Sequence, residues 1–258
     1  MKKSILSRVV IGAISLVFFL IIWDRAAASI RSPYLPLPYD VLKALVSMLV
    51  FNQVDHTGRL MSDHISASVF RVLYGFAFAA VVGVPVGLFT GWSWYVESAT
   101  NPIIEVIRPI PPLAWIPFAI KFFGDPFNTV FIVFIGAIFP TILSTVSGVK
   151  AIDPILVDAA KTLGATRSKL FTKVVVPSSA PSITTGLRIG LGVGWMCIVA
   201  AEMVGVKTGG LGYYILVMMD IGRFENVFAG MILIGIIGFV MVTAMSYIER
   251  RLSKWARM

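Results

Sequence analysis

Charged side chains are scarce in this sequence. They account for 14% of its 258 residues, while 57% of the residues are hydrophobic. A soluble globular domain carries about 25% charged residues, so a soluble chain of this composition could not cover its core with charge. The composition argues against an ordinary soluble domain and predicts an all-α protein that crosses a membrane several times.

Residues that bind metals or form disulfides are also few. The single cysteine, Cys197, lies inside an apolar run and is interpreted as a small buried side chain. His56 and His64 stand eight positions apart in a polar stretch, a spacing that does not suit a metal site. We therefore expect no disulfide, no metal and no cofactor.

A phosphate-binding loop is missing as well. The sequence contains no Gly-x-x-x-x-Gly-Lys-Ser/Thr stretch, the motif whose backbone cradles the phosphates of ATP, so the chain is not expected to hydrolyse ATP. Its net charge of +9 does not indicate nucleic acid, because no basic stripe with interleaved aromatic residues lies outside the apolar segments.

Six apolar segments are long enough to cross a membrane as helices, which takes about 20 residues each. Prolines interrupt the third of them. The segments run from Val9 to about Ala28, Ala67 to Trp92, Asn101 to Phe123, Phe127 to Val149, Ser182 to Val206 and Val227 to Tyr247. We expect a single membrane domain over residues 1–258, with its core at about 67–250.

The first apolar segment has an alternative interpretation as a cleaved signal peptide, because the small residues Ala26-Ala27-Ala28 follow it. Its length, and Asp24-Arg25 just before that site, favour an uncleaved helix. A shorter apolar pattern at Val41–Phe51 cannot span and predicts a helix at the membrane surface.

The distribution of lysine and arginine predicts the orientation. With both termini in the cytoplasm, inner segments hold 13 of these residues and outer segments hold 7. Basic residues are enriched on the cytoplasmic side of membrane proteins. We therefore expect cytoplasmic N- and C-termini and a cytoplasmic loop at Lys150–Pro181.

That loop is the longest inner segment, and its local pattern predicts two short helices. Asp153 suits a helix N-cap and Pro154 the first helical position. Gly164 fits the end of this helix and Thr166 the start of a second one through about Lys173, which Pro177 is expected to limit. The residues alone leave two interpretations open, a protein-docking loop and an amphipathic loop on the membrane.

The stretch from Asp158 to Pro177 resembles the conserved loop of permease subunits of ATP-binding-cassette (ABC) importers. That family pattern is Glu-Ala-Ala, three residues, Gly, nine residues, Ile, one residue, Leu-Pro. The matching positions here are Asp158-Ala159-Ala160, Gly164, Val174 and Val176-Pro177. Aspartate in place of glutamate, and valine in place of isoleucine and leucine, are conservative departures.

Other segments resemble the nitrate, sulfonate and taurine-type branch of these permeases. Ile107–Gly124 is similar to their third helix and Gly186–Met203 to their fifth, and Gly209–Ile215 and the end near Ile248–Leu252 also fit. The resemblance implies a type I ABC importer permease in the inner membrane. It further implies a homodimer, two copies of a cytoplasmic ATPase and an external solute-binding protein. The implied solute is nitrate, taurine, an alkanesulfonate or another small oxyanion, with pyrimidine precursors and bicarbonate still open.

The resemblance also implies where the ATPase docks and where the loop transmits motion. The expected docking residues are Asp158, Ala159, Ala160, Lys161, Leu163, Gly164 and Ala165. A small pair such as Ala159-Ala160 lets another protein approach the backbone closely.

Two places are candidates for the solute pathway or its gate. The first is the proline-rich break in the third span, where broken helices tend to border a cavity. Its candidate residues are Arg108, Pro109, Pro111, Pro112 and Trp115. Arg108 has two interpretations, a residue beside the path of an anion or a partner of Glu105 one turn earlier, and Trp115 can equally be a packing residue.

The second candidate is Glu202, near the end of the fifth span. An intramembrane carboxylate is a functional candidate by default, so Glu202 is expected either to face the pathway or to stabilise the outer loop by pairing with Lys207. An intramembrane enzyme is disfavoured, because no histidine lies in a span and Glu105 and Glu202 stand apart. A secondary transporter or channel that is not coupled to ATP is the alternative, but neither inverted repeats nor charged relay residues stand out.

Overall fold

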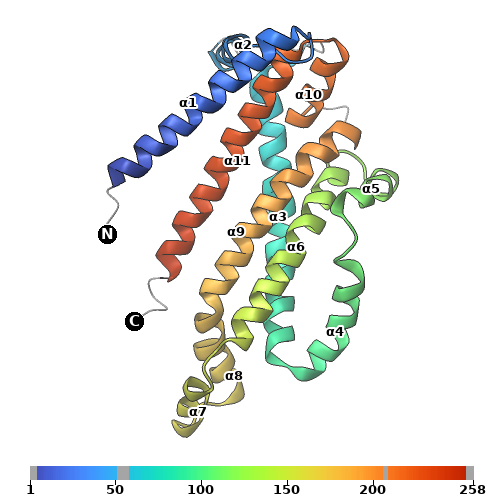
Figure 1. The fold of residues 1–258 in the computed structure, drawn as a ribbon. Coiled ribbons are helices and arrows are strands. Elements are labelled where there is room, and N and C mark those ends of the chain that lie inside the picture. Colours follow the sequence, from blue (N-terminus) through green and yellow to red (C-terminus); the bar gives the residue numbers. More distant parts are fainter. Residues whose placement is uncertain (1–4, 51–57, 206–208, 254–258) are drawn as a thin grey trace. The chain divides into compact units, whose positions relative to one another are not determined.

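The computed structural model describes residues 5–50, 58–205 and 209–253, and the regular elements in these ranges are all helices (Figure 1). The all-α prediction is thereby confirmed. The elements are α1 (Ile5–Ile30), α2 (Pro38–Val50), α3 (Met61–Trp92), α4 (Trp94–Ile107), the 3-10 helix η1 (Pro112–Trp115), α5 (Ile116–Phe122), α6 (Phe127–Lys150), α7 (Pro154–Thr162), α8 (Arg167–Leu170), the π-helix η2 (Phe171–Val175), α9 (Val176–Gly205), α10 (Leu211–Asp220) and α11 (Phe224–Ser253).

The described chain divides into two compact units. One contains the residues up to His64 together with Tyr214–Gly235, and so holds α1, α2, most of α10 and the first part of α11. The other contains Ile65–Tyr213 and the residues from Ile236 onward. All the candidate functional residues lie in this second unit.

The membrane-spanning helices agree with the prediction of about six spans. Five stretches are long and apolar enough to cross a membrane: the helix from Val10, α3, α6, the helix from α8 through α9, and α11. A sixth is possible if α4 and the η1–α5 pair count as one broken span, bent by 86°.

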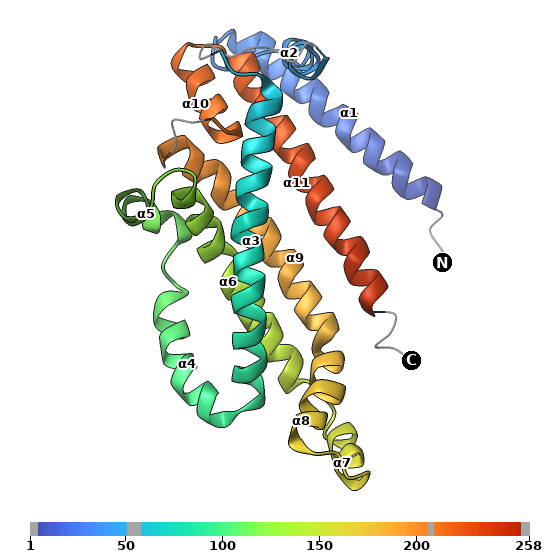
Figure 2. The same cartoon turned by 180° about the vertical axis from the view of Figure 1, so that it is seen from behind.

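Close packing of α3 on α6 rests on glycines spaced four residues apart. A Cβ atom added at Gly75 would lie 2.6 Å from the Val130 carbonyl oxygen, and one at Gly87 would lie 2.6 Å from Thr145 Cβ. Without a hydrophobic effect between helices in lipid, such small residues let backbones approach and gain dispersion energy. Figure 2 shows α3 in front of α6, and Figure 1 shows it behind.

The packing of α9 on α6 follows the same rule. A Cβ atom added at Gly186 would lie 2.5 Å from Ser144 Cβ, and one added at Gly190 would lie 2.8 Å from the Ala137 carbonyl oxygen. The two helices therefore pack closely along each other, and both views show α3 next to them (Figures 1 and 2).

The fifth span begins earlier than the sequence predicts. The expected stop at Pro177 is wrong, because α8, the π-helical Phe171–Val175 and α9 form one continuous apolar helix from Arg167 to Gly205. Pro177 lies almost directly after the π-helix, where the hydrogen-bond pattern of the continuous helix changes, so its missing N–H does not end the helix.

The third span is broken more sharply than a kink. The helix α4 starts at Trp94 and ends at Ile107, and the chain resumes as η1 and α5 in a different direction. Pro109, Pro111 and Pro112 explain the break, because each lacks a donor N–H, and Pro111, which precedes Pro112, has an extended backbone with a ψ of 135°.

Two shorter helices complete the description. The predicted surface helix at Val41–Phe51 corresponds to α2, whose described part ends at Val50. The helix α10 was not predicted, since its ten residues are too few to span and the glycines before it read as a loop.

Candidate functional site

The inner loop begins with a capped helix. The Asp153 carboxylate accepts a hydrogen bond from the Ile155 backbone N–H at 2.9 Å, and Pro154 occupies the first helical position. Both features match the sequence prediction, because a capping carboxylate satisfies an N–H that has no partner within the helix. The helix α7 therefore starts at a fixed residue.

Gly164 ends α7 in a left-handed conformation, with a φ of 76°. The Ala165 N–H donates to the Ala160 carbonyl at 3.0 Å and the Gly164 N–H donates to the Lys161 carbonyl at 2.9 Å. This pair of bonds is a Schellman motif, which glycine favours because it has no Cβ atom to clash. Thr166 then caps α8 by accepting from the Lys169 N–H at 3.4 Å.

The surface of α7 and its turn is apolar and open. Leu163, on the turn, is 88% exposed, and Ile155 and Leu156 are exposed on the helix beside Ala159. We call Ile155, Leu156, Ala159, Ala160 and Leu163 the loop surface. The predicted docking residues Asp158 and Lys161 form an ion pair of 3.0 Å next to it, so charge borders the apolar patch.

The base of the loop is anchored in the helix core. Phe171 of the π-helix stacks on Phe89 with ring centroids 5.4 Å apart and lies 5.9 Å from the ring of Trp92, so it holds α8 against the end of α3. Val175, fully buried, packs with Leu88 of α3. Sequence reasoning missed this anchor, because aromatic residues in an apolar helix carry no signal about their distant partners.

The predicted pair at the broken span is present. Arg108 lies 3.0 Å from Glu105, and both side chains are exposed in this chain. Arg108 follows the last residue of α4, where its backbone N–H still donates to the Ile104 carbonyl at 2.9 Å. The arginine therefore stands at the break and not inside a regular helix.

In the proline-rich segment after Arg108, the side chain of Trp115 lies against the core. Pro111 and Leu113 are exposed, while Trp115 is half-buried and packs against a core cluster that includes Ile116 and Cys197. The Trp115 indole N–H is buried and has no hydrogen-bond partner in the part of the chain that the structure describes. Packing is thus one observed role of Trp115.

Glu202 is completely buried and holds an ion pair that the sequence analysis did not identify. Its carboxylate lies 2.9 Å from an Arg71 nitrogen of α3, and Arg71 is only 4% exposed. The Ser68 hydroxyl lies 2.8 Å from both carboxylate oxygens. A buried charge is tolerated when it is paired and its remaining lone pairs are bonded.

The same charges hold the loop that follows α9. Arg71 donates to the Gly209 carbonyl at 2.6 Å, Ser68 accepts from the Leu211 N–H at 2.8 Å, and Glu202 accepts from the Gly212 N–H at 3.0 Å. We call Ser68, Arg71, Glu202 and the backbone of residues 209–212 the clamp.

The position of Gly210 in the clamp requires a glycine. Its φ is 135°, and a Cβ atom at this position would overlap the Glu202 carboxylate. Of the two roles expected for Glu202, this geometry favours stabilisation of a loop, with Arg71 as the partner. The other expected partner, Lys207, lies outside the described residues.

No group of three or more His, Cys, Asp or Glu side chains that could hold a metal occurs among the described residues. The expectation that His64 is an exposed loop residue outside the spans is wrong, because it lies buried in α3 with its ring against Tyr214, and His56 lies outside the described residues. What the arrangement offers is an open apolar loop surface at one end of α9 and a closed charged clamp at the other.

Comparison with known proteins shows the same kind of molecule. Residues 83–257 match the family described as "binding-protein-dependent transport system inner membrane component". The chain is 42% identical to a putative ABC transporter permease protein of Methanocaldococcus jannaschii over 241 residues, which is 92% of this chain and 89% of that protein.

Two relatives have named solutes. The chain is 34% identical to the taurine transport system permease protein of Escherichia coli, with 90% of this chain and 84% of the relative covered. It is 31% identical to the nitrate import permease protein of Synechocystis, with 96% and 92% covered.

A solved structure supports the fold. The chain resembles a chain of the MetNI methionine ABC transporter in an inward-facing conformation, with a TM-score of 0.64 and 21% identity over 72% of this chain and 93% of that one. At this identity the likeness carries the fold alone, and it agrees with the type I importer fold that the sequence predicted.

Proposed function

We propose that this chain, which belongs to the family of binding-protein-dependent transport system inner membrane components, carries a small oxyanion across the membrane as one of two identical permease copies. The protein is the permease subunit of an ABC importer. It is a transport component and not an enzyme, and its partners are a separate ATPase and a solute-binding protein.

The solute class is supported by the relatives. One of them is named for taurine and another for nitrate, and both solutes present negatively charged oxygen atoms on a small group. These solutes share oxyanion chemistry rather than a carbon skeleton. A small oxyanion is therefore the class that we propose for this chain.

We place the ATPase contact on the loop surface and the residues around it, Asp158–Ala165. The observation that carries this assignment is Leu163, a large apolar side chain that is 88% exposed on a turn of fixed geometry. An exposed apolar patch with a charged border is typical of an interaction site. The small residues Ala159 and Ala160 leave room for close approach to the α7 backbone.

The orientation that we propose puts this loop and both termini in the cytoplasm, as the distribution of lysine and arginine favours. An ATPase in the cytoplasm can then reach the loop. We also propose that the break at Arg108–Trp115 borders the solute path, because non-helical backbone at membrane depth is tolerated beside protein or water but not beside lipid.

A docking experiment tests the assignment. We expect Leu163→Glu to remove the ATPase from complexes purified through a tagged permease, because a charge at a tight apolar contact loses its hydration. Interface positions of this kind contribute about 2 kcal/mol or more, which is about a 30-fold loss of affinity. Ala160→Glu should act in the same way. The same result supports a cytoplasmic loop, since the ATPase is cytoplasmic.

The matched control is Tyr39→Glu, which adds the same charge at an exposed position of α2 that we place on the other side of the membrane. This variant should keep the ATPase. Retention of the ATPase at the wild-type level by both Leu163→Glu and Ala160→Glu would remove the loop surface from the interface.

A further inference from the structure

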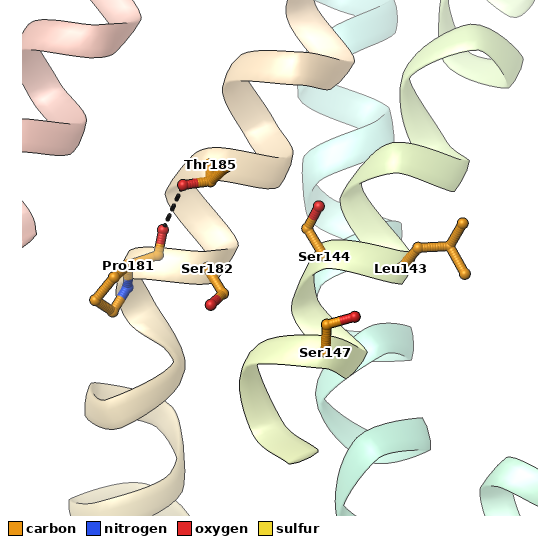
Figure 3. Close-up of a pocket in the computed structure, with 6 residues that line it drawn as sticks. All are labelled: Leu143, Ser144, Ser147, Pro181, Ser182 and Thr185. Carbon is orange, nitrogen blue, oxygen red and sulfur yellow. Dashed lines mark hydrogen bonds between the residues drawn. The ribbon is translucent and has the colours of Figure 1, made fainter. Parts of the chain in front are cut away.

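An open hollow lies between α6 and α9. It has a volume of about 390 Å³, within the range of about 300–1,000 Å³ that is usual for small-molecule sites. Figure 3 shows hydroxyl-bearing residues on both of the facing helices. The lining residues are Leu143, Ser144, Ser147, Pro181, Ser182 and Thr185.

The serine hydroxyls of the hollow differ from the other hydroxyls of these helices. Thr141 and Thr145 of α6 are buried and donate to carbonyls of the preceding turn at 2.8 and 2.7 Å. By contrast, the side-chain hydroxyls of Ser144, Ser147 and Ser182 make no hydrogen bond with any residue that the structure describes. Three donors therefore face the hollow with their hydrogen-bonding capacity unused.

The surroundings of the hollow require a polar occupant. It lies within two membrane spans, its three serine hydroxyls do not use the carbonyls of their own preceding turns as Thr141 and Thr145 do, and hydrocarbon offers a hydroxyl no other partner. The exposed face of α3 is suited to lipid, because Phe78 and Val81 border a second hollow there that is lined almost entirely by apolar atoms. The hydroxyl hollow on α6 and α9 therefore faces water or a polar solute.

The rim of the hollow is balanced in charge. Arg188, one turn from Thr185 on α9, lies 2.8 Å from Glu249 of α11. The second oxygen of Glu249 accepts from the Thr185 hydroxyl at 2.6 Å, so Thr185 positions this carboxylate. The groups left to donate hydrogen bonds to a solute are therefore neutral hydroxyls. Several weak donors suit a conducting pathway, because the solute must leave it as readily as it enters.

We propose that Ser144, Ser147 and Ser182 line the route of the solute through the part of the membrane next to the loop, and that their hydroxyls donate hydrogen bonds to the oxygen atoms of a small oxyanion. This inference rests on the proposed function and names the residues of its pathway. It excludes lipid and a tightly packed second copy as the occupant of the hollow.

Cysteine labelling of the complete importer in membranes tests the occupant. Cys197 is the single cysteine of this chain, so Cys197→Ala gives a permease without thiols, and labelling is read on the permease itself. Ser147→Cys, exposed in the hollow, is compared with Val81→Cys, exposed on the apolar face of α3. The probe is 2-sulfonatoethyl methanethiosulfonate, whose sulfonate resembles that of taurine. We expect the probe to modify Ser147→Cys, to block import, and to leave Val81→Cys unmodified.

Two outcomes would overturn the inference. If Ser147→Cys resists the probe as Val81→Cys does, lipid covers the hollow. If it resists the probe but forms a disulfide between two permease copies on oxidation, a second copy fills the hollow. In both cases normal oxyanion import by the unlabelled importer would leave the proposed function standing, whereas an importer that carries no oxyanion would contradict the function itself.

Removal of the hydroxyls tests the hydrogen bonds. The Cβ atoms of Ser144 and Ser182 lie against Gly186 and Gly148, so alanine keeps these Cβ contacts while it removes the hydroxyls, whose oxygen atoms also lie close to the two glycines. We expect the triple variant S144A/S147A/S182A to slow taurine or nitrate import by about tenfold, since one hydrogen bond contributes about two- to tenfold. ATPase co-purification should not change. An unchanged import rate would show that the hydroxyls do not contact the solute.

Discussion

The two ends of the long helix Arg167–Gly205 are built in opposite ways. At one end α7 and its glycine turn present Leu163 and Ile155 to the surroundings, and the contacts within the turn are local backbone bonds. At the other end Glu202 is fully buried and is held by Ser68 and Arg71, which come from α3. One end leaves apolar side chains exposed, as the proposed ATPase contact requires, and the other is closed by the chain itself.

The difference shows which kind of contact each end needs. A surface that must bind and release a partner keeps its apolar residues exposed on a rigid turn. A loop that must stay in place is tied by charges that no other partner can reach. Changes at the closed end should therefore affect folding, and changes at the open end should affect transport.

The largest effect is expected at the clamp. Arg71→Leu leaves the Glu202 carboxylate buried without its partner, and breaking a buried pair in this way costs about 3–5 kcal/mol. We expect a much lower unfolding temperature of the detergent-purified permease, measured by thermal unfolding. The double variant Arg71→Met/Glu202→Leu should recover much of the loss, because it removes both charges. A single variant as stable as the wild type would show that the clamp does not hold the fold.

A smaller effect on stability, but a large one on transport, is expected at Gly164. A left-handed backbone costs an ordinary residue about 1–2 kcal/mol, and the glycine has no neighbour within 4 Å that a side chain would strike. We expect Gly164→Val to insert normally and to uncouple ATP hydrolysis from import, measured together in reconstituted vesicles.

Gly222 provides the matched control. It has the same φ of 76° and also no neighbour within 4 Å, but it lies between α10 and α11. Gly222→Val imposes the same backbone strain away from the loop surface and should keep import coupled to ATP. Normal coupling in Gly164→Val would contradict the role of the turn.

The smallest effect on stability is expected at the exposed pair of the broken span. Arg108 and Glu105 are 41% and 49% exposed, and such pairs contribute about 0–1 kcal/mol. Arg108→Leu should therefore leave the unfolding temperature nearly unchanged while it slows oxyanion import by the complete importer. If import is unchanged as well, Arg108 is a surface residue and not part of the proposed gate.

Features that depend on neighbouring residues could be predicted from the sequence, whereas contacts between residues far apart in the sequence could not. Asp153 and Gly164 were identified correctly, because a cap and a glycine turn depend on residues within one or two turns. Arg71 and Glu202 are 131 positions apart, and nothing local marks them as partners. The serines of the hollow gave no signal either, since exposed and back-bonded hydroxyls look alike in a sequence.

Proline gave one correct and one wrong expectation for a physical reason. Pro109, Pro111 and Pro112 follow one another closely, so no helix can absorb them, and the predicted break is present. Pro177 follows the π-helix Phe171–Val175 within the continuous helix Arg167–Gly205, at a place where the hydrogen-bond pattern changes and a missing N–H is tolerated. A single proline next to a π-helix is therefore weak evidence for the end of a helix.

The continuous helix from α8 to α9 acts as a mechanical lever. Its 39 residues correspond to a length of about 58 Å at 1.5 Å per residue. A tilt of only about 5° about the clamped end would displace the other end by about 5 Å, nearly one helical turn. The stacking of Phe171 on Phe89 would carry that displacement into α3. If the proposed ATPase moved the loop end by about 5 Å, the helix would tilt by about 5°, and the residues that line the hollow, which lie between the two ends, would shift by a smaller distance.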